Sequence, residues 1–395
     1  MKYLKAFLYL FFFFTLWVLI IWITNVFQAS FIERNTFFSS TFNWWSQNNL
    51  NDHYFLGVMN DDYIVENQVY TSYTIQALFA NYTLLSTLNI LTGRTFEVTQ
   101  NFLVYILEFL FLVTIYFTRK KQIDLILKSK NLLHFIWIFL IVGILVTNPL
   151  PWISFLKYST ENFYFIISIV FCYLSVFAKS FNLQKKDFLF LITGLIISSF
   201  FIVFIVPWIL LYIYTEHYVK LRKKMWINIS IISIYGILSY LTPFIFQRIK
   251  GFENVSSGFL FRSGLDGSSI YLKSTFSPIL HAASEQHFGN ILLLSFGLIS
   301  TTYILKSNWK YTLDRLIMSL IPGIFIFVLI PQHCTIHMYM FEFLIITPLV
   351  FNLIYQLLSI EISQLSPKKY VFFVGLFLLL IMGQLVEISK SFLNW

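Results

Sequence analysis

Two adjacent carboxylates are the residues of this sequence whose type and spacing could do acid–base chemistry. Asp61 and Asp62 lie in a polar, aromatic stretch, residues 25–97, between two long apolar runs. A carboxylate in such a place can accept the proton of an acceptor hydroxyl, or orient that hydroxyl for attack. Because adjacent side chains usually point in different directions, we expect only one of the two to reach the reacting atom. The structural alternative is a pair of solvated loop charges or a local cap.

Two histidines form the second candidate group. His333 and His337 are four residues apart, so on a helix they share one face. This spacing can bind zinc, but no Glu follows the first His as it does in the zinc proteases. The sequence therefore assigns no metal ligands and leaves a divalent cation open as a cofactor. Binding of an anionic group or an acceptor sugar, and a purely interfacial polar role, are the other interpretations.

A third candidate group surrounds Arg262, which lies close to Gly264, Asp266 and Gly267. A guanidinium beside flexible backbone suits a phosphate, which it can grip with two parallel hydrogen bonds. The alternative is a turn in which Arg262 pairs with Asp266.

The elements that must position these residues are membrane helices. Hydrophobic residues make up 58% of the 395-residue chain and charged residues only 11%, whereas a soluble domain carries about a quarter charged residues. The 20% aromatic content argues against a disordered chain, and two cysteines argue against a disulfide scaffold. These numbers predict an all-α, polytopic integral membrane protein, with residues 1–395 forming a single membrane domain.

Apolar runs of about 20 residues, the length that crosses a bilayer, predict the spans. The first, residues 6–24, is interpreted as a retained anchor and is followed by the long outer loop 25–97, where Trp44 and Trp45 indicate interfacial helices. The region 98–246 holds further spans, 247–289 a second outer loop, and 290–388 the C-terminal spans. Individual spans after the first are expected near residues 98–118, 132–147, 162–178, 226–246, 290–305, 316–330, 343–358 and 370–388.

Residues 187–217 form an apolar stretch that is too long for one span and too short for two full spans. One helix would be about 45 Å long, against a hydrocarbon core of about 30 Å. Two short helices turning near residues 198–207 place 19 of the 27 Lys and Arg on one side of the membrane, whereas a single helix places 15 there. Basic residues collect in cytoplasmic loops, so the sequence favours the hairpin. About eleven spans and a cytoplasmic N-terminus follow. The net charge of +9 then describes topology and not a nucleic-acid partner.

The sequence resembles the multi-pass glycosyltransferases of the GT-C fold, which include protein mannosyltransferases and the aminoarabinose transferases of lipid A. One shared feature is the long first outer loop with its acidic pair in residues 60–63, followed by Val69, Tyr70 and a weakly apolar stretch. A second is the short helix hairpin with basic ends. A third is the late outer loop that carries His333, His337 and Tyr339.

This resemblance implies a transferase that moves a sugar from a polyprenyl-phosphate donor to a glycan, lipid or protein acceptor. The reaction would take place on the outer face of a bacterial plasma membrane, with the lipid bilayer as a further partner. Asp61 or Asp62 would be the catalytic base, and outer basic and histidine residues would steady the departing lipid phosphate. The substrate-binding residues implied are Glu66, Tyr70, Arg262, Asp266, His333, His337 and Tyr339.

Two alternatives stay open. A surface-polysaccharide polymerase also has many spans and a large outer loop, but usually shows several outer Arg and a large late loop. A lipid-linked sugar flippase or transporter often shows two matching halves with Gly- or Pro-broken helices. This chain shows no such repeat and has only 14 Gly.

Overall fold

A computed structural model describes the second half of the chain in most detail. The described residues are 162–178, 181–200, 202–216, 222–249, 288–304, 309–329, 342–359 and 365–393, together with Ile64, Val65, Gln68, Val69, Ile141, Gly143 and Ile144. The predicted spans at 6–24 and 98–118, most of the span at 132–147, and nearly all of both outer loops lie outside these residues.

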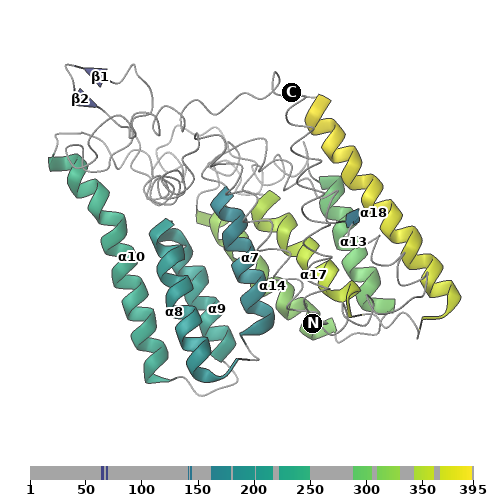
Figure 1. Ribbon diagram of the computed structural model, residues 1–395, viewed down its shortest axis with the longest axis horizontal. Coiled ribbons are helices and arrows are strands. Elements are labelled where there is room, and N and C mark those ends of the chain that lie inside the picture. Colours follow the sequence, from purple (N-terminus) through teal and green to yellow (C-terminus); the bar gives the residue numbers. More distant parts are fainter. Residues whose placement is uncertain are drawn as a thin grey trace, which may run out of the picture.

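The described part is helical, apart from one short antiparallel ladder in which Ile64 pairs with Val69 and Val65 with Gln68 (Figure 1). The ladder consists of β1 (Ile64–Val65) and β2 (Gln68–Val69). The helices are α7 (Asn162–Phe177), α8 (Leu183–Phe200), the 3₁₀ turn η3 (Ile202–Phe204), α9 (Ile205–Glu216), α10 (Lys223–Ile249), α13 (Phe288–Ile304), α14 (Trp309–Leu329), the π-helical η6 (Glu342–Ile346), α17 (Thr347–Leu357) and α18 (Pro367–Leu393).

Each apolar run expected after residue 160 has become a helix in the structure. Three of these helices are long and apolar enough to cross a membrane, over Lys223–Leu241 in α10, Trp309–Leu329 in α14 and Pro367–Val386 in α18. These lengths and compositions are those of an integral membrane protein. The full set of about eleven spans remains a prediction, because part of it lies outside the described residues.

The apolar segment at residues 187–217 folds as two helices, α8 and α9, with η3 between them. The Asn182 side chain accepts a hydrogen bond from the backbone N–H of Lys185 (3.0 Å), which caps the start of α8. Gly194 then lets α8 approach closely: a Cβ there would lie 2.5 Å from Nε1 of Trp208 on α9 and 2.5 Å from Ile232 on α10. The absence of a side chain at Gly194 thus lets the hairpin pack tightly against itself and against α10.

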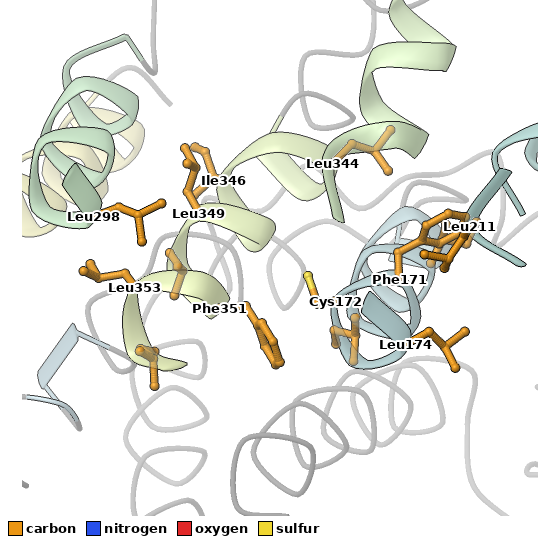
Figure 2. Close-up of a cluster of buried hydrophobic side chains, with 14 of the residues drawn as sticks. Phe171, Cys172, Leu174, Leu211, Leu298, Leu344, Ile346, Leu349, Phe351 and Leu353 are labelled. Carbon is orange, nitrogen blue, oxygen red and sulfur yellow. The ribbon is translucent and has the colours of Figure 1, made fainter. Parts of the chain in front are cut away.

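Helix α17 lies at the centre of the helical core. Almost every side chain from Thr347 to Leu357 is buried, and the helix packs against α7, α13 and α14. Figure 2 shows its leucines and Phe351 between α13 on one side and α7 on the other. Cys172 of α7 is also fully buried in this core, as expected for a cysteine that serves helix packing.

A proline explains why the helix entering this core is irregular. Pro348 has no N–H to offer to the carbonyl four residues earlier, which belongs to Leu344. The residues just before it form the π segment η6. Gly323, next to Pro322 in α14, lies so close that a Cβ would be 2.9 Å from the Leu344 oxygen. A side chain at Gly323 would therefore push α14 away from η6.

The helices present two distinct ends. Helices α8, α10, α14 and α18 begin, and α9, α13 and α17 finish, at one end, which we call the charged end. Hydrogen bonds tie these termini together: the Tyr214 hydroxyl donates to Asp314 (2.6 Å), Gln356 Nε2 donates to Thr312 (2.7 Å), and Lys369 Nζ donates to the Ile304 carbonyl (3.4 Å). The opposite end carries the η3 turn, the last residue of α10 and the first residue of α13 (Figure 1).

Candidate functional site

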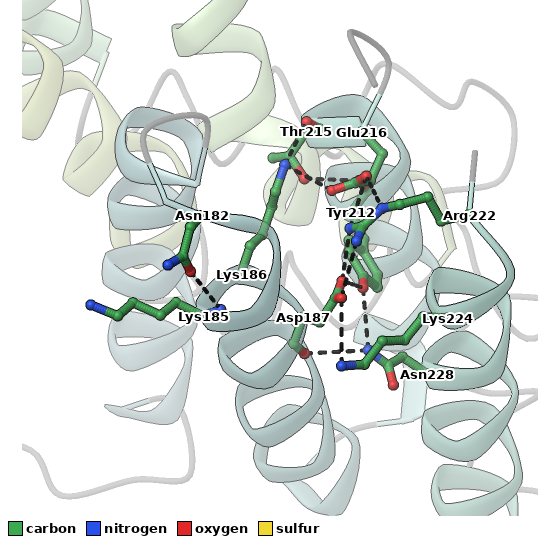
Figure 3. A network of polar contacts seen from close by, with 10 residues as sticks. All are labelled: Asn182, Lys185, Lys186, Asp187, Tyr212, Thr215, Glu216, Arg222, Lys224 and Asn228. Carbon is green, nitrogen blue, oxygen red and sulfur yellow. Dashed lines mark hydrogen bonds and ion pairs between the residues drawn. The ribbon is translucent and has the colours of Figure 1, made fainter. Parts of the chain in front are cut away.

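A cluster of buried charges joins α8, α9 and the start of α10 at the charged end (Figure 3). We call Lys186, Asp187, Glu216 and Arg222 the charged cluster. Lys186 Nζ lies 2.7 Å from Oε1 of Glu216, and Arg222 lies 3.0 Å from Asp187 and 3.1 Å from Glu216. Both carboxylates and Lys186 are almost completely buried, whereas the Arg222 side chain is 23% exposed.

Arg222 bridges the two carboxylates. Its Nη1 and Nη2 donate to the two oxygens of Asp187 (3.2 and 3.0 Å), while Nε and Nη2 donate to one oxygen of Glu216 (3.2 and 3.1 Å). Partial burial lowers the pKa of the guanidinium, but the negative charges of Glu216 and Asp187 outweigh it, so that the pKa is raised. The contact with Asp187 has the two-pronged geometry that makes arginine a strong partner of carboxylates.

The order of residues along the chain explains how the cluster forms. Lys186 and Asp187 are neighbours in the first turns of α8, so their side chains diverge, one toward Glu216 and the other toward Arg222. Tyr212 lies one helical turn before Glu216 on α9, and its hydroxyl donates to Asp187 (2.7 Å). Asn228 of α10 donates both to the Tyr212 hydroxyl (3.2 Å) and to the Asp187 carbonyl (3.3 Å). Three helices are thus locked to one another by polar contacts.

The charged cluster is built to hold helices together. Each oxygen of Asp187 and Glu216 faces a cationic donor, with Lys224 at 3.8 Å as a further partner of Asp187. A general base needs a lone pair directed at a substrate proton, and here these positions are taken by Arg and Lys. The arrangement therefore supports a structural role.

A second polar group, without carboxylates, lies between α14 and α17. We call Thr312, Arg315, Ser319, Asn352 and Gln356 the amide network. Asn352 accepts a hydrogen bond from Nε of Arg315 (2.7 Å) and donates to Ser319 (3.1 Å), while Gln356 donates to Thr312 (2.7 Å). The spacing places the α14 members on one face and the α17 members, four residues apart, on the facing side.

Arg315 corrects one sequence-based expectation. The span expected at residues 316–330 leaves Arg315 in the loop before it, but α14 begins at Trp309. The Arg315 side chain is only 2% exposed. Its guanidinium lies 4.1 Å from the centre of the Tyr355 ring and 5.7 Å from that of Tyr311. Aromatic faces and the Asn352 oxygen together stabilise a cation inside the helix bundle.

The residues that the sequence singles out for chemistry all lie outside the described part of the chain. They are Asp61, Asp62, Glu66, Tyr70, Arg262, Asp266, His333, His337 and Tyr339. The structure nevertheless describes the helix ends that lead to two of their loops. Residues 250–287 connect Ile249 of α10 to Phe288 of α13, and residues 330–341 connect Leu329 of α14 to Glu342 of η6. These four helix ends lie at the opposite end of the bundle from the charged cluster.

Sequence reasoning missed the charged cluster, although a signal was present. The charge count uses the basic residues at the ends of the hairpin only as markers of topology. Yet an acid stands at each end of the apolar hairpin, Asp187 and Glu216, and a hairpin brings its two ends together. Buried acids near basic residues at both ends of such a segment predict paired charges.

The described residues contain no group of three or more His, Cys, Asp and Glu side chains that could hold a metal ion. The chain matches no protein-family model, no curated protein and no solved structure.

Proposed function

We propose that this protein is a membrane glycosyltransferase of the GT-C type, with about eleven spans and a cytoplasmic N-terminus. It transfers a sugar from a polyprenyl-phosphate donor to a glycan, lipid or protein acceptor on the outer face of a bacterial plasma membrane. The observation that carries the proposal is the acidic pair Asp61–Asp62 in a long polar loop between apolar runs.

The arrangement of the helix ends supports this proposal. The loop that contains Arg262 and the loop that contains His333 and His337 both start and finish at the end of the bundle opposite the charged end. Lys and Arg dominate the charged end, which is typical of a cytoplasmic side. Residues proposed to bind the phosphate would then share one face of the membrane, where a lipid-linked donor presents its sugar.

The tight hairpin α8–α9 is a second support, because the resemblance implies a short helix pair with basic ends at this place. Its polar ends are Lys185 and Lys186 at the start of α8 and, after α9, Arg222 just before α10. The charged cluster gives this pair a fixed geometry, and the apolar helices α10, α14 and α18 provide the membrane setting that a polyprenyl donor requires.

In the proposed reaction, Asp61 or Asp62 accepts the proton of the acceptor hydroxyl as its oxygen bonds to the anomeric carbon of the sugar. The bond from that carbon to the lipid phosphate breaks, and the phosphate leaves with the electron pair. Arg262, His333 and His337 offset the negative charge that develops on the phosphate. Positioned bases contribute about 10²–10⁴-fold to such rates.

The test replaces each acid separately, Asp61→Asn and Asp62→Asn, in the full chain reconstituted into vesicles. Release of polyprenyl phosphate from a set of polyprenyl-phosphate hexoses and pentoses is measured with mixed acceptors. One variant should lose at least about 100-fold in turnover, whereas Asp52→Asn, an acid of the same loop, should retain it. Wild-type turnover in both variants would show that neither Asp61 nor Asp62 is the catalytic base. Movement of the donor across the bilayer without bond cleavage would favour a flippase.

A further inference from the structure

Six exposed lysines gather at the charged end of the bundle. Lys185 belongs to α8, and Lys223 and Lys224 are the first two residues of α10. Lys310 follows the first residue of α14, and Lys368 and Lys369 follow the first residue of α18. Lys224 is 60% exposed even though it lies 3.8 Å from Asp187. Three of the four helices concerned are the ones long and apolar enough to cross a membrane.

The exposed charge at this end is positive throughout the described residues. Among the residues that the structure describes, the carboxylates there are Asp187, Glu216 and Asp314, and none of them is exposed. The first two are held in the charged cluster, and Asp314 accepts a hydrogen bond from the Tyr214 hydroxyl. Because the acids are turned inward, they contribute little to offset the lysines at the surface.

The lysines also stand where a helix does not favour them. The N-terminus of a helix carries partial positive charge and prefers Asp or Glu in its first turn. Helices α8, α10, α14 and α18 have no acid there and have lysine in its place. Local helix energetics therefore do not explain these lysines, whereas an anion outside the helix would compensate their charge.

Apolar and aromatic side chains beside the lysines indicate that this anion belongs to a lipid. Trp226 and Ile227 of α10 are about half exposed next to Lys224, and Trp309 of α14 is about half exposed next to Lys310. On α18, Val371 is 69% exposed just after the lysine pair. Aromatic rings favour the headgroup level of a bilayer, so a headgroup could contact the lysines while its acyl chains contact the apolar helix surface.

We infer that the charged end is a binding surface for anionic phospholipid headgroups of the adjacent leaflet. The surface is formed by the six lysines together with Trp226 and Trp309. This inference goes beyond the proposed glycosyl transfer and does not depend on it, because no step of that reaction uses these residues. Lysines that served only to orient the chain during insertion would leave the finished protein without a preference for anionic lipid.

The test uses native mass spectrometry of the full chain in detergent, titrated with phosphatidylglycerol or phosphatidylcholine. A basic residue near an anionic surface changes binding about fivefold. Phosphatidylglycerol should therefore bind at least about tenfold more tightly than phosphatidylcholine. The triple variant Lys223→Gln, Lys310→Gln, Lys368→Gln should lose most of this preference. None of the three lysines forms a salt bridge within the described residues, so the fold should survive.

The matched control replaces the same three lysines by arginine, which keeps the charge and should keep binding within about twofold. Salt at 0.5 M should weaken phosphatidylglycerol binding to the wild type, because exposed charges are screened. Equal affinity for the two lipids, or wild-type binding by the glutamine variant, would overturn the inference. Displacement of the lipid by millimolar inorganic phosphate would show that a soluble anion, and not a lipid, is the ligand.

Discussion

The charged cluster and the amide network compensate the charge of buried cationic side chains in different ways. Both bury cationic side chains among helices at the charged end. The charged cluster neutralises Lys186 and Arg222 with two carboxylates, whereas the amide network surrounds Arg315 with tyrosine rings and one amide oxygen. The difference teaches that compensation by full charges joins three helices rigidly. Compensation by dipoles and aromatic faces joins two helices, and removal of one of its contacts should cost less stability.

The largest effect is expected from Glu216→Gln, which leaves the buried ammonium of Lys186 without its carboxylate. Breaking a buried ion pair costs about 3–5 kcal/mol, measurable as a lower unfolding midpoint in detergent. The double change Lys186→Met with Glu216→Met should restore much of the loss. The exposed neighbour provides a control, since Lys185→Gln should stay within about 0.5 kcal/mol of wild type. If the single variant were as stable as wild type, the cluster would not hold the hairpin.

In the amide network, Asn352→Leu removes the oxygen that accepts the Arg315 Nε–H. A hydrogen bond to a charged group is worth about 1.5–3 kcal/mol, so the loss should be smaller than for the ion pair. Asn352→Asp keeps an acceptor at the same place and should lose less. A loss equal to or larger than that of Glu216→Gln would reverse the ranking of the two regions.

Packing of the hairpin can be separated from its charges with Gly194→Ala. The new Cβ would lie 2.5 Å from Trp208 and from Ile232, and over-packing of this kind costs about 1–3 kcal/mol. Gly375 of α18 is the matched control, because a Cβ there meets nothing within 4 Å. Gly375→Ala should therefore leave the unfolding midpoint unchanged or raise it. Equal midpoints for the two variants would mean that α8, α9 and α10 are not tightly packed.

The smallest effect is expected from Gln356→Leu, which removes a neutral hydrogen bond to Thr312. Such bonds between membrane helices average about 0.6 kcal/mol. The double variant Gln356→Leu with Thr312→Val should be no less stable than Gln356→Leu alone, because no buried partner is left unsatisfied. Unfolding in bicelles at several denaturant concentrations can resolve this difference. A loss above about 2 kcal/mol would mean that the Gln356 hydrogen bond contributes as much stability as a hydrogen bond to a charged group.

Hydrophobic run length and basic residues predicted much of the described fold from the sequence. The helices and the hairpin at residues 187–217 follow from the length of apolar runs against the thickness of a bilayer. The buried pairing of Asp187 and Glu216 with basic residues does not follow from run length, because both acids lie at the flanks of an apolar segment. A basic residue alone does not mark the start of a span, because two tyrosine rings and Asn352 allow α14 to include Arg315. The π segment before Thr347 agrees with Pro348, which the sequence shows, whereas the close contact of this segment with Gly323 is a tertiary feature that no local pattern reveals.

We propose that Asp61 or Asp62 performs the chemistry, whereas Asp187 and Glu216 hold α8, α9 and the start of α10 together. The most direct test measures, for each single Asp→Asn or Glu→Gln variant, both the unfolding midpoint and the rate of polyprenyl-phosphate release per folded molecule. We predict that Asp61→Asn or Asp62→Asn abolishes release without changing the midpoint, and that Glu216→Gln lowers the midpoint while folded molecules keep their rate. Wild-type release by both loop variants, or loss of release in Glu216→Gln at an unchanged midpoint, would contradict the account.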